Sequence, residues 1–223
     1  MHTIAIDGPA GAGKSTIAKK IAQELGFVYV DTGAMYRAMA LYFIRQGIDV
    51  EDDGAVVQAC KEVEVTITYV DGEQQVLLNG ENVNGLIRTE QVSMMTSNSS
   101  KNKNVRMKLV ELQRSLADKE NVIMDGRDIG TYVLPQAETK IYLTASSACR
   151  AKRRYEEQKA RGVECDLATI EKDIIARDNQ DMNREFAPLK QAEDAILVDS
   201  SEMTIDEVVN AIIEIYRSRR GDL

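Results

Sequence analysis

The fold is decided by the stretch Gly8-Pro9-Ala10-Gly11-Ala12-Gly13-Lys14-Ser15, which fills every fixed position of the pattern G-x-x-x-x-G-K-[ST]. An apolar run, Ile4 to Ile6, precedes it, and Ile17, Ile21 and Leu25 follow at the spacing of one helix face. The stretch is therefore predicted to join a strand to a helix. Its glycines let N–H groups approach an anion, and the new helix adds unpaired N–H donors and the positive end of its dipole.

Two side chains complete this loop as a site for nucleotide phosphates. Lys14 can reach the β- and γ-phosphates, and the Ser15 hydroxyl is placed to ligate a Mg2+ ion that bridges them. A glycine-rich turn that binds nothing is the alternative, but such a turn would not need every fixed residue of the pattern. We expect the phosphates to be bound by Gly8, Gly11, Ala12, Gly13, Lys14, Ser15 and Thr16.

The composition is that of a globular protein without a general affinity for polyanions. Its 223 residues, 43% hydrophobic and 29% charged, are enough for one α/β domain with small insertions. The net charge of −8 argues against nonspecific binding to nucleic acid or to an anionic membrane. No apolar run has the length of a membrane span or a signal peptide, and the three cysteines lack metal-ligand spacing. We therefore expect a cytoplasmic protein with free thiols.

Histidine chemistry is excluded, because His2 is the only histidine and lies at the start of the chain. This removes a histidine general base, a histidine-ligated zinc ion and a Ser/His triad. The remaining chemistry must use carboxylates, lysine, arginine and an oxygen-ligated metal.

The chain then repeats the order of strand, loop and helix. The run from Phe27 to Val30 precedes Asp31 and Thr32, and helical spacing follows from Met35 to Gln46. This alternation predicts a parallel sheet with ligands at the carboxyl ends of its strands. Arg37 lies near such an end, although a solvated helix residue is an equally good interpretation of it.

The region from residue 62 to 88 has a different pattern. Apolar and polar residues alternate from Val63 to Tyr69, and Asp71-Gly72 and Asn79-Gly80 are hairpin signals. We expect a small antiparallel insert that packs against the domain or acts as a lid. A polar segment, residues 89–104, then leads to a helix from about Val105 to Asp118.

Charged residues follow the next two buried strands. Asp125-Gly126-Arg127-Asp128 comes directly after the strand 121–124, where buried charges need partners, so we favour a functional role. The basic run from Arg150 to Arg154 follows the strand around Ile141 to Leu143, with Lys159 and Arg161 beyond it. It predicts a mobile helix that closes over nucleotide phosphates, the alternative being a solvated helix face paired with acidic neighbours.

A long helix from Asp166 to about Arg184 brings three charged residues to one face. They are Arg177, Asp181 and Arg184, at i, i+4 and i+7. The face either lines a cleft or holds only an i,i+4 ion pair. The strand Ala195 to Asp199 and a final helix, which begins with a capping box at Thr204, complete the chain.

Together these segments resemble the bacterial cytidylate kinases, which have the P-loop nucleoside monophosphate kinase fold, and the resemblance covers essentially the whole chain. The phosphate loop alone indicates only a nucleotide, whereas Asp31 to Arg37 and Asp125 to Thr131, in that order, are much more specific. The segment Arg177 to Leu189 also matches, as do Ile87-Arg88-Thr89 and Ala145-Ser146-Ser147. Thr32 departs from the serine of many members, but either hydroxyl can donate to a phosphate.

The resemblance implies Mg2+-dependent, in-line phosphoryl transfer from ATP to CMP or dCMP by a monomer. It implies that the acceptor phosphate is held by Thr32, Arg37 and Arg127, cytosine by Ser97, Arg106, Asp128 and Arg184, and the ribose by Arg177 and Asp181. The catalytic residues are expected to be Lys14, Arg37, Arg127 and Arg154. A carboxylate suits the exocyclic amine of cytosine and would oppose the carbonyl of uracil, which supports the role of Asp128.

The expected fold is one α/β kinase domain with a central parallel sheet flanked by helices. Its core would comprise residues 1–61, 89–145 and 163–223, with an antiparallel monophosphate-binding insert at about 62–88 and a helical lid at about 146–162.

Three other functions remain open at this stage. A kinase for UMP or a purine monophosphate is disfavoured by Asp128 and Arg184 but not excluded. A GTP-binding switch would need an N-K-x-D motif, and the nearest string, Asn102-Lys103-Asn104-Val105, lacks the acid. A nucleic-acid-binding module is disfavoured by the acidic charge and by an aromatic content of 5%.

Overall fold

The computed structural model describes residues 1–221, which form two compact units. Residues 1–29 and 120–221 belong to the first unit, and Val30–Lys119 form the second. Each unit is built around its own sheet.

The first unit contains the parallel sheet that carries the phosphate loop. Its strand order is β2-β6-β1-β7-β8, and β1 pairs in parallel with both β6 and β7, as does β7 with β8. The strands are β1 (Thr3–Asp7), β2 (Val28–Asp31, of which Val28 and Tyr29 belong to this unit), β6 (Val122–Gly126), β7 (Thr139–Thr144) and β8 (Ile196–Asp199). The predicted parallel sheet is confirmed, and the carboxyl ends of β1 and β6 lie together because Asp7 is in register with Gly126.

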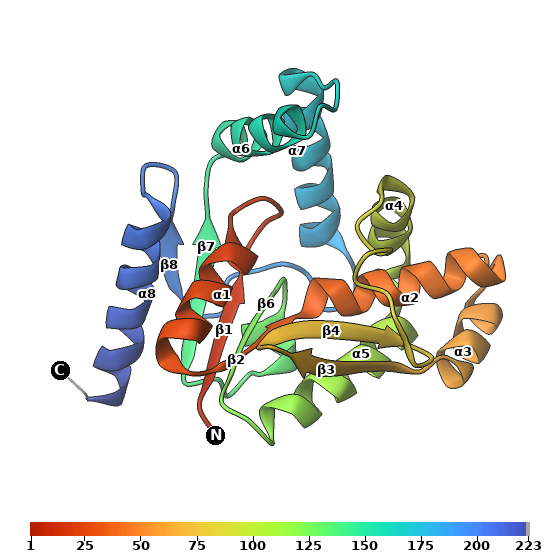
Figure 1. Cartoon of the computed structure of the whole chain (residues 1–223), viewed down its shortest axis with the longest axis horizontal. Helices are drawn as coiled ribbons and strands as arrows, with labels where there is room; N and C mark the ends of the chain where they lie inside the picture. The colour runs from red at the N-terminus through yellow and green to blue at the C-terminus, as the bar shows by residue number, and fades with distance from the viewer. Residues whose placement is uncertain (222–223) are drawn as a thin grey trace. The chain divides into compact units, whose positions relative to one another are not determined.

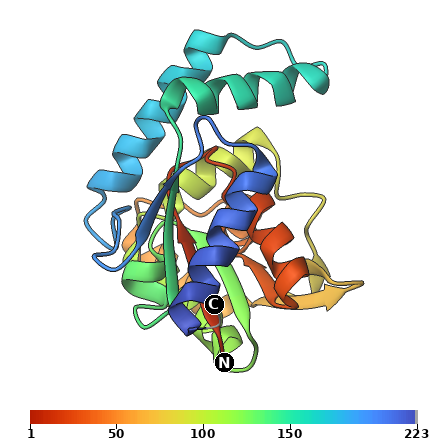
Figure 2. The ribbon, with the colours of Figure 1, turned by 90° about the vertical axis from the view of Figure 1, so that its left-hand side faces the viewer.

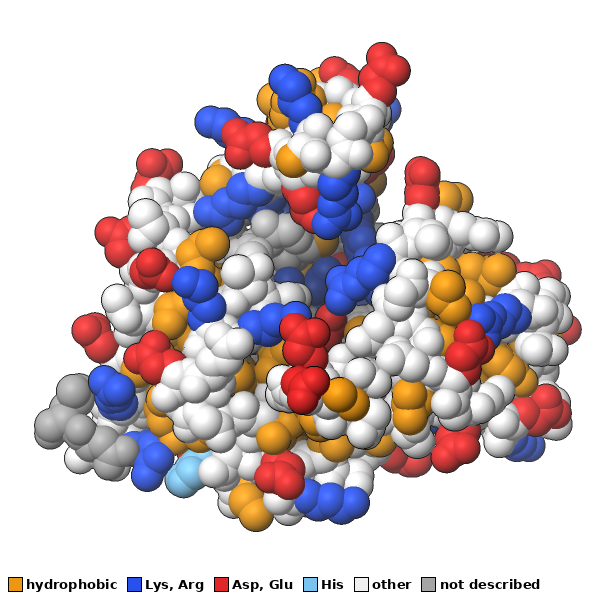
Figure 3. Space-filling view, in the orientation of Figure 1, with side chains coloured by type: hydrophobic (Ala, Val, Ile, Leu, Met, Phe, Trp, Pro, Cys, Tyr) orange, Lys and Arg blue, Asp and Glu red, His pale blue; other side chains and the backbone are white. Residues whose placement is uncertain are grey.

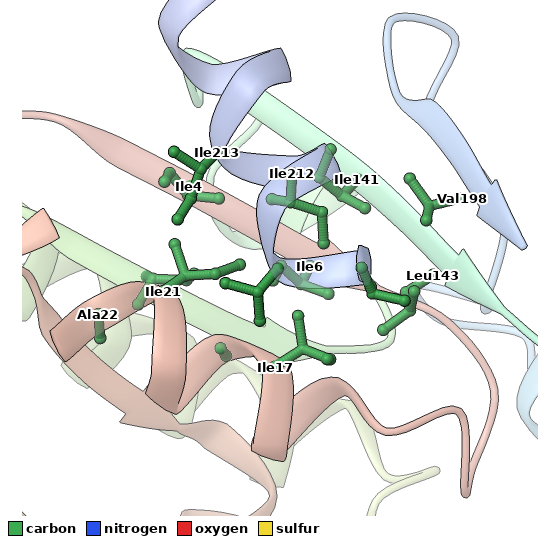
Figure 4. Packing of buried hydrophobic residues seen from close by; sticks show 14 of the residues in the cluster. Ile4, Ile6, Ile17, Ile21, Ala22, Ile141, Leu143, Val198, Ile212 and Ile213 are labelled. Atoms are coloured by element: carbon green, nitrogen blue, oxygen red, sulfur yellow. The ribbon is translucent and has the colours of Figure 1, made fainter. Parts of the chain in front are cut away.

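Two helices cover one face of this sheet. They are α1 (Lys14–Leu25) and α8 (Ile205–Arg220), the latter with the predicted capping box of Thr204 and Glu207. In Figure 4 the isoleucines of both helices point at Ile4 and Ile6 of β1 and at Ile141 of β7. Burial of each such side chain contributes about 1.5–3 kcal/mol. This core fixes the start of α1, and with it the phosphate loop.

A helical pair and a short π-helix complete the first unit. Helices α6 (Ser147–Ala160) and α7 (Leu167–Asn183) lie side by side in Figures 1 and 2 and share a small core of Ala151, Ile170 and Ile174. The π-helix η1 (Ile129–Val133) follows β6 directly. Sequence periodicity did not predict it, because five residues are too few to show a helical repeat.

The second unit surrounds the predicted antiparallel sheet. The sheet has the order β3-β4-β5, with β3 (Val65–Val70), β4 (Glu73–Leu78) and β5 (Glu81–Asn82). Both predicted turns have positive φ at their two central residues: 52° and 78° at Asp71-Gly72, and 49° and 84° at Asn79-Gly80. This is the backbone that a tight hairpin requires.

Four helices accompany this sheet: α2 (Thr32–Gln46), α3 (Asp53–Glu62), α4 (Glu90–Ser99) and α5 (Lys103–Ala117). Helix α2 begins at Thr32, earlier than predicted, because Asp31 caps it by accepting from the Ala34 N–H. Helix α4 was not predicted at all. Its buried face consists only of Val92, Thr96 and Ser99, so its sequence has the pattern of a polar segment without a helix. Across residues 1–221, no helix is long and apolar enough to cross a membrane.

Candidate active site

The phosphate loop connects the last residue of β1 to the first of α1. Gly8 has φ of 148°, and a Cβ there would lie 1.9 Å from the Leu143 carbonyl oxygen of β7. Gly13 has φ of 88° and open space around it. The first glycine is therefore required by close approach of two strands, and the last by a left-handed backbone.

Lys14 is folded into the loop. Its Nζ donates to the Pro9 carbonyl oxygen at 2.7 Å, and the side chain is buried. Burial, followed by repulsion from Arg127, lowers the pKa of Lys14 to about 7. A phosphate anion at the loop would favour the charged ammonium.

Ser15 and Asp125 form an oxygen pair beside the loop. The Ser15 hydroxyl donates to Asp125 Oδ2 at 2.9 Å, and the Tyr29 hydroxyl donates to Asp125 Oδ1 at 2.8 Å. Groups of three metal-ligating side chains are absent from the described part of the chain. One hydroxyl and one carboxylate fit Mg2+, which prefers oxygen ligands and keeps several waters or substrate oxygens. Sequence analysis assigned no metal role to Asp125, although its position at the end of β6 was a usable signal.

The segment after β6 is joined to α7 by two ion pairs. Arg127 Nε contacts Asp181 Oδ2 at 2.9 Å, and Arg184 Nη2 contacts Asp128 Oδ1 at 3.2 Å. Burial raises the pKa of Asp181, but the guanidinium of Arg127, with those of two further arginines, holds it below its ordinary value. The structure therefore brings together four residues that were predicted to bind the substrate.

Arg184 is held from a second side by a strained residue. Ala187 has φ of 49°, and its carbonyl oxygen accepts from Arg184 Nε at 2.7 Å and also from Nη2. A left-handed alanine costs about 1–2 kcal/mol. The strained conformation of Ala187 thus directs its carbonyl group at the guanidinium of Arg184.

Arg177 lies on the same helix but does not form the ion pair that was considered for it. Asp181 pairs with Arg127 instead. The Nε of Arg177 is buried without a hydrogen-bond partner in residues 1–221. Burial, and then the charge of Arg127, lowers the pKa of Arg177. A ligand oxygen beside it would compensate the buried N–H.

The basic run of α6, residues 150–154, contains arginines that are bound to neighbouring groups and one that is exposed. Lysine and arginine side chains gather around the α6–α7 pair in Figure 3. Arg150 is buried: it forms an ion pair with Asp178 at 2.7 Å and donates to the carbonyl oxygens of Ala10 and Ala145. Arg153 donates to the Ser200 carbonyl oxygen at 2.6 Å.

Arg154 is different from these two arginines. It is exposed and makes no hydrogen bond or ion pair within the described residues. Of the arginines at positions 150, 153 and 154, it is therefore the most exposed and the one that no neighbour holds in place.

The remaining predicted residues belong to the second unit. Arg37 Nη1 donates to the Ser93 hydroxyl at 2.7 Å and to the Ile87 carbonyl oxygen at 3.3 Å. Arg106 is buried, lies over the ring of Tyr36 and donates to the Ser100 carbonyl oxygen. The other two are Thr32, at the start of α2, and Ser97, on α4.

Sequence analysis gave no role to Asp7, a further buried acid. Asp7 ends β1, and its two carboxylate oxygens accept the N–H groups of Ile129 and Gly130, each at 2.7 Å. Burial raises the pKa of Asp7 to about 7. The signal was an acid at the end of an otherwise apolar strand, directly before the loop.

A parallel sheet, a phosphate loop and clustered arginines define the class of a P-loop kinase. An uncharacterized protein from Eubacterium ventriosum, known from its crystal structure, has a similar fold: the TM-score is 0.54 at 13% identity, covering 98% of this chain and 99% of that one.

Sequence comparison identifies the family. The family model described as "Cytidylate kinase" matches residues 4–218. A cytidylate kinase of Caldicellulosiruptor bescii is 50% identical and covers 96% of this chain and 94% of its own. One from Geobacillus sp. (strain WCH70) is 49% identical and covers 98% of this chain and 97% of its own. The chain belongs to the cytidylate kinase family, as its resemblance indicated, and is an enzyme that transfers phosphoryl groups between small-molecule nucleotides.

Proposed function

We propose that this protein transfers the γ-phosphoryl group of ATP to CMP or dCMP, giving ADP and CDP or dCDP, as a cytoplasmic monomer. The observation that carries the proposal is that one unit contains both a phosphate loop and the Asp128–Arg184 pair, at 3.2 Å, which suits a cytosine base.

The donor phosphates would be bound by the loop and by α1. The backbone N–H groups from Gly8 to Thr16 and the Lys14 ammonium supply the positive field. Ser15 and Asp125 would hold Mg2+, which neutralises charge on the phosphate oxygens when bound. Arg154, exposed on α6, would add a further positive charge at the transferred group.

The acceptor phosphate would be aligned by Thr32, Arg37 and Arg127. This assignment is supported by the hydrogen bonds that hold the two arginines in place. Arg37 is bound to Ser93 at 2.7 Å, and Arg127 is bound to Asp181 at 2.9 Å. A held guanidinium loses little freedom on binding, so it can fix the attacking oxygen in line. The protein needs no general base, since this phosphate oxygen is already an anion near neutral pH.

Cytosine would be recognised by charge complementarity. The Asp128 carboxylate accepts from the exocyclic amine, while Arg184 and Arg106 donate to the ring acceptors, and Ser97 adds a hydroxyl. Uracil would place a carbonyl against the carboxylate, which is worth about 1–3 kcal/mol of discrimination. The ribose would be held by Arg177 and Asp181, and its oxygens would satisfy the buried Arg177 Nε.

A coupled assay of ADP release tests the proposal. The enzyme is supplied with ATP and Mg2+ and with each nucleoside monophosphate in turn. Turnover with CMP and dCMP at least tenfold above UMP, AMP and GMP is expected. Equal activity on all acceptors would contradict the base assignment, and activity on UMP or a purine monophosphate alone would favour the alternative of a kinase for another nucleoside monophosphate.

A further inference from the structure

We propose that Asp7 is a positioning residue for base selection, because its carboxylate clamps the backbone that carries Asp128. The inference rests on the proposed function and extends it to a residue outside the substrate-binding set. Asp7 itself would not touch the nucleotide base.

The clamp is formed by two short hydrogen bonds. The Ile129 N–H donates to Asp7 Oδ1 and the Gly130 N–H to Oδ2, both at 2.7 Å. These two residues directly follow Asp128 and open the π-helix η1. The first N–H groups of a helix have no partner within it, so Asp7 supplies the acceptors that they need. The peptide on the carboxyl side of Asp128 is thereby fixed to the end of β1.

A second side chain, that of Lys140, lies against the same side of Gly130 as Asp7. A Cβ on Gly130 would lie 3.2 Å from Lys140 Cδ and 3.4 Å from Asp7 Oδ2. The Lys140 ammonium is itself held by the Pro135 carbonyl oxygen at 2.6 Å and by Asp194 at 2.8 Å. The start of η1 is therefore packed closely against the side chains of Asp7 at the end of β1 and Lys140 of β7.

This close packing bears on selectivity through Arg184. The Asp128 side chain is hydrogen-bonded to Arg184, whose guanidinium also binds the Ala187 carbonyl oxygen. A shift of the Asp128 backbone would separate this pair and change the donors and acceptors offered to a base. The side chains of Lys14, Ser15 and Thr16, which are proposed to bind the donor phosphates, lie on α1 and not on η1.

Asp7→Asn is the sharpest test, because it conserves volume but replaces one acceptor oxygen by an N–H donor that faces the backbone donors. The kcat/KM ratio of CMP to UMP is expected to fall about tenfold. The KM for CMP is expected to rise. Gly130→Ala, whose Cβ would press on Lys140 and Asp7 and so displace η1, is expected to lower the same ratio even where Asp7→Asn does not fold.

Ile212→Ala is the matched control. Ile212 belongs to α8, is buried in the core and lies outside the substrate-binding residues, so its variant is destabilised without moving η1. Ile212→Ala is expected to keep the wild-type ratio of the kcat/KM values for CMP and UMP. An unchanged ratio in folded Asp7→Asn and Gly130→Ala, or an equal loss in Ile212→Ala, would overturn the inference.

A measurement without substrate separates this inference from the proposed function. Amide exchange at Ile129 and Gly130 is expected to accelerate at least tenfold in Asp7→Asn and to remain slow in Ile212→Ala. Unchanged protection at these amides would refute the clamp. Wild-type enzyme that shows no preference for CMP would refute the proposed function, even with the clamp demonstrated.

Discussion

Loss of Arg150 is expected to destabilise the first unit strongly. Arg150 and Asp178 have side chains that are 7% and 10% exposed, and their charged atoms are 2.7 Å apart. In Arg150→Met the Asp178 carboxylate would remain buried without its counterion, and its Oδ1 already lacks a hydrogen-bond partner among the residues described. Breaking a buried pair in this way costs about 3–5 kcal/mol. At about 2–4 °C per kcal/mol for a chain of this size, Tm should fall by about 6–20 °C.

The assay is unfolding followed by circular dichroism, with heat and with urea, on a double-mutant cycle. Asp178→Leu alone should also be unstable, because it leaves the buried guanidinium of Arg150 uncompensated. The double variant Arg150→Met with Asp178→Leu removes both charges and should recover most of the loss.

The control for this cycle is the exposed pair of Arg161 and Glu157, whose side chains are 70% and 59% exposed. Arg161→Met should change the free energy of unfolding by less than about 0.5 kcal/mol. A loss below about 1 kcal/mol for Arg150→Met, or a double variant as unstable as the sum of the single ones, would refute the reasoning.

Three further outcomes are expected. Asp128→Asn should bring the kcat/KM values of CMP and UMP within about threefold of each other, because an amide can turn its donor toward the uracil carbonyl; a retained preference would contradict the assignment. Binding of ATP should take up a proton at pH 8, because burial and Arg127 hold the pKa of Lys14 at about 7 and bound phosphates raise it. Affinity should therefore fall as pH rises above about 7. Calorimetry in two buffers of different ionisation enthalpy checks this, and Lys14→Arg, always charged, should show no uptake. Ala187→Gly should leave the free energy of unfolding within about 1 kcal/mol of wild type, since glycine relieves the left-handed strain, whereas Ala151→Gly in the packed interior of α6 should cost more than about 1 kcal/mol; equal losses in urea unfolding would argue against strain at Ala187.

Features encoded by local patterns were predictable from the sequence. The phosphate loop, the strands of the parallel sheet and both hairpins of the second unit depend on residues close in the chain, such as Asn79 beside Gly80. Helix α4 was not predicted, because its buried face is narrow and partly polar. The π-helix η1 was not predicted either, because its five residues show no periodic spacing of apolar side chains.

The partners of buried charges were not predictable, since they are distant in the chain. Asp7 binds N–H groups 122 and 123 residues away, and Ser15 meets Asp125 across 110 residues. Asp128 and Arg184, which the resemblance assigned to the same base, form an ion pair in the structure. Charge patterning alone could not distinguish an arginine that is held in an ion pair from one that is accessible to a ligand. Arg150 and Arg154 look alike in the sequence, and only packing distinguishes the buried ion pair from the exposed side chain.

The contact of Gly8 with β7 affects how such loops are interpreted in uncharacterised genes. A side chain at this position would collide with the Leu143 carbonyl oxygen whether or not a nucleotide is bound. A descendant that had lost all affinity for nucleotides would still need glycine here to keep its sheet intact. Retention of this first glycine is thus a marker of folding, and an assignment of nucleotide binding should weigh the lysine and serine at the end of the motif instead.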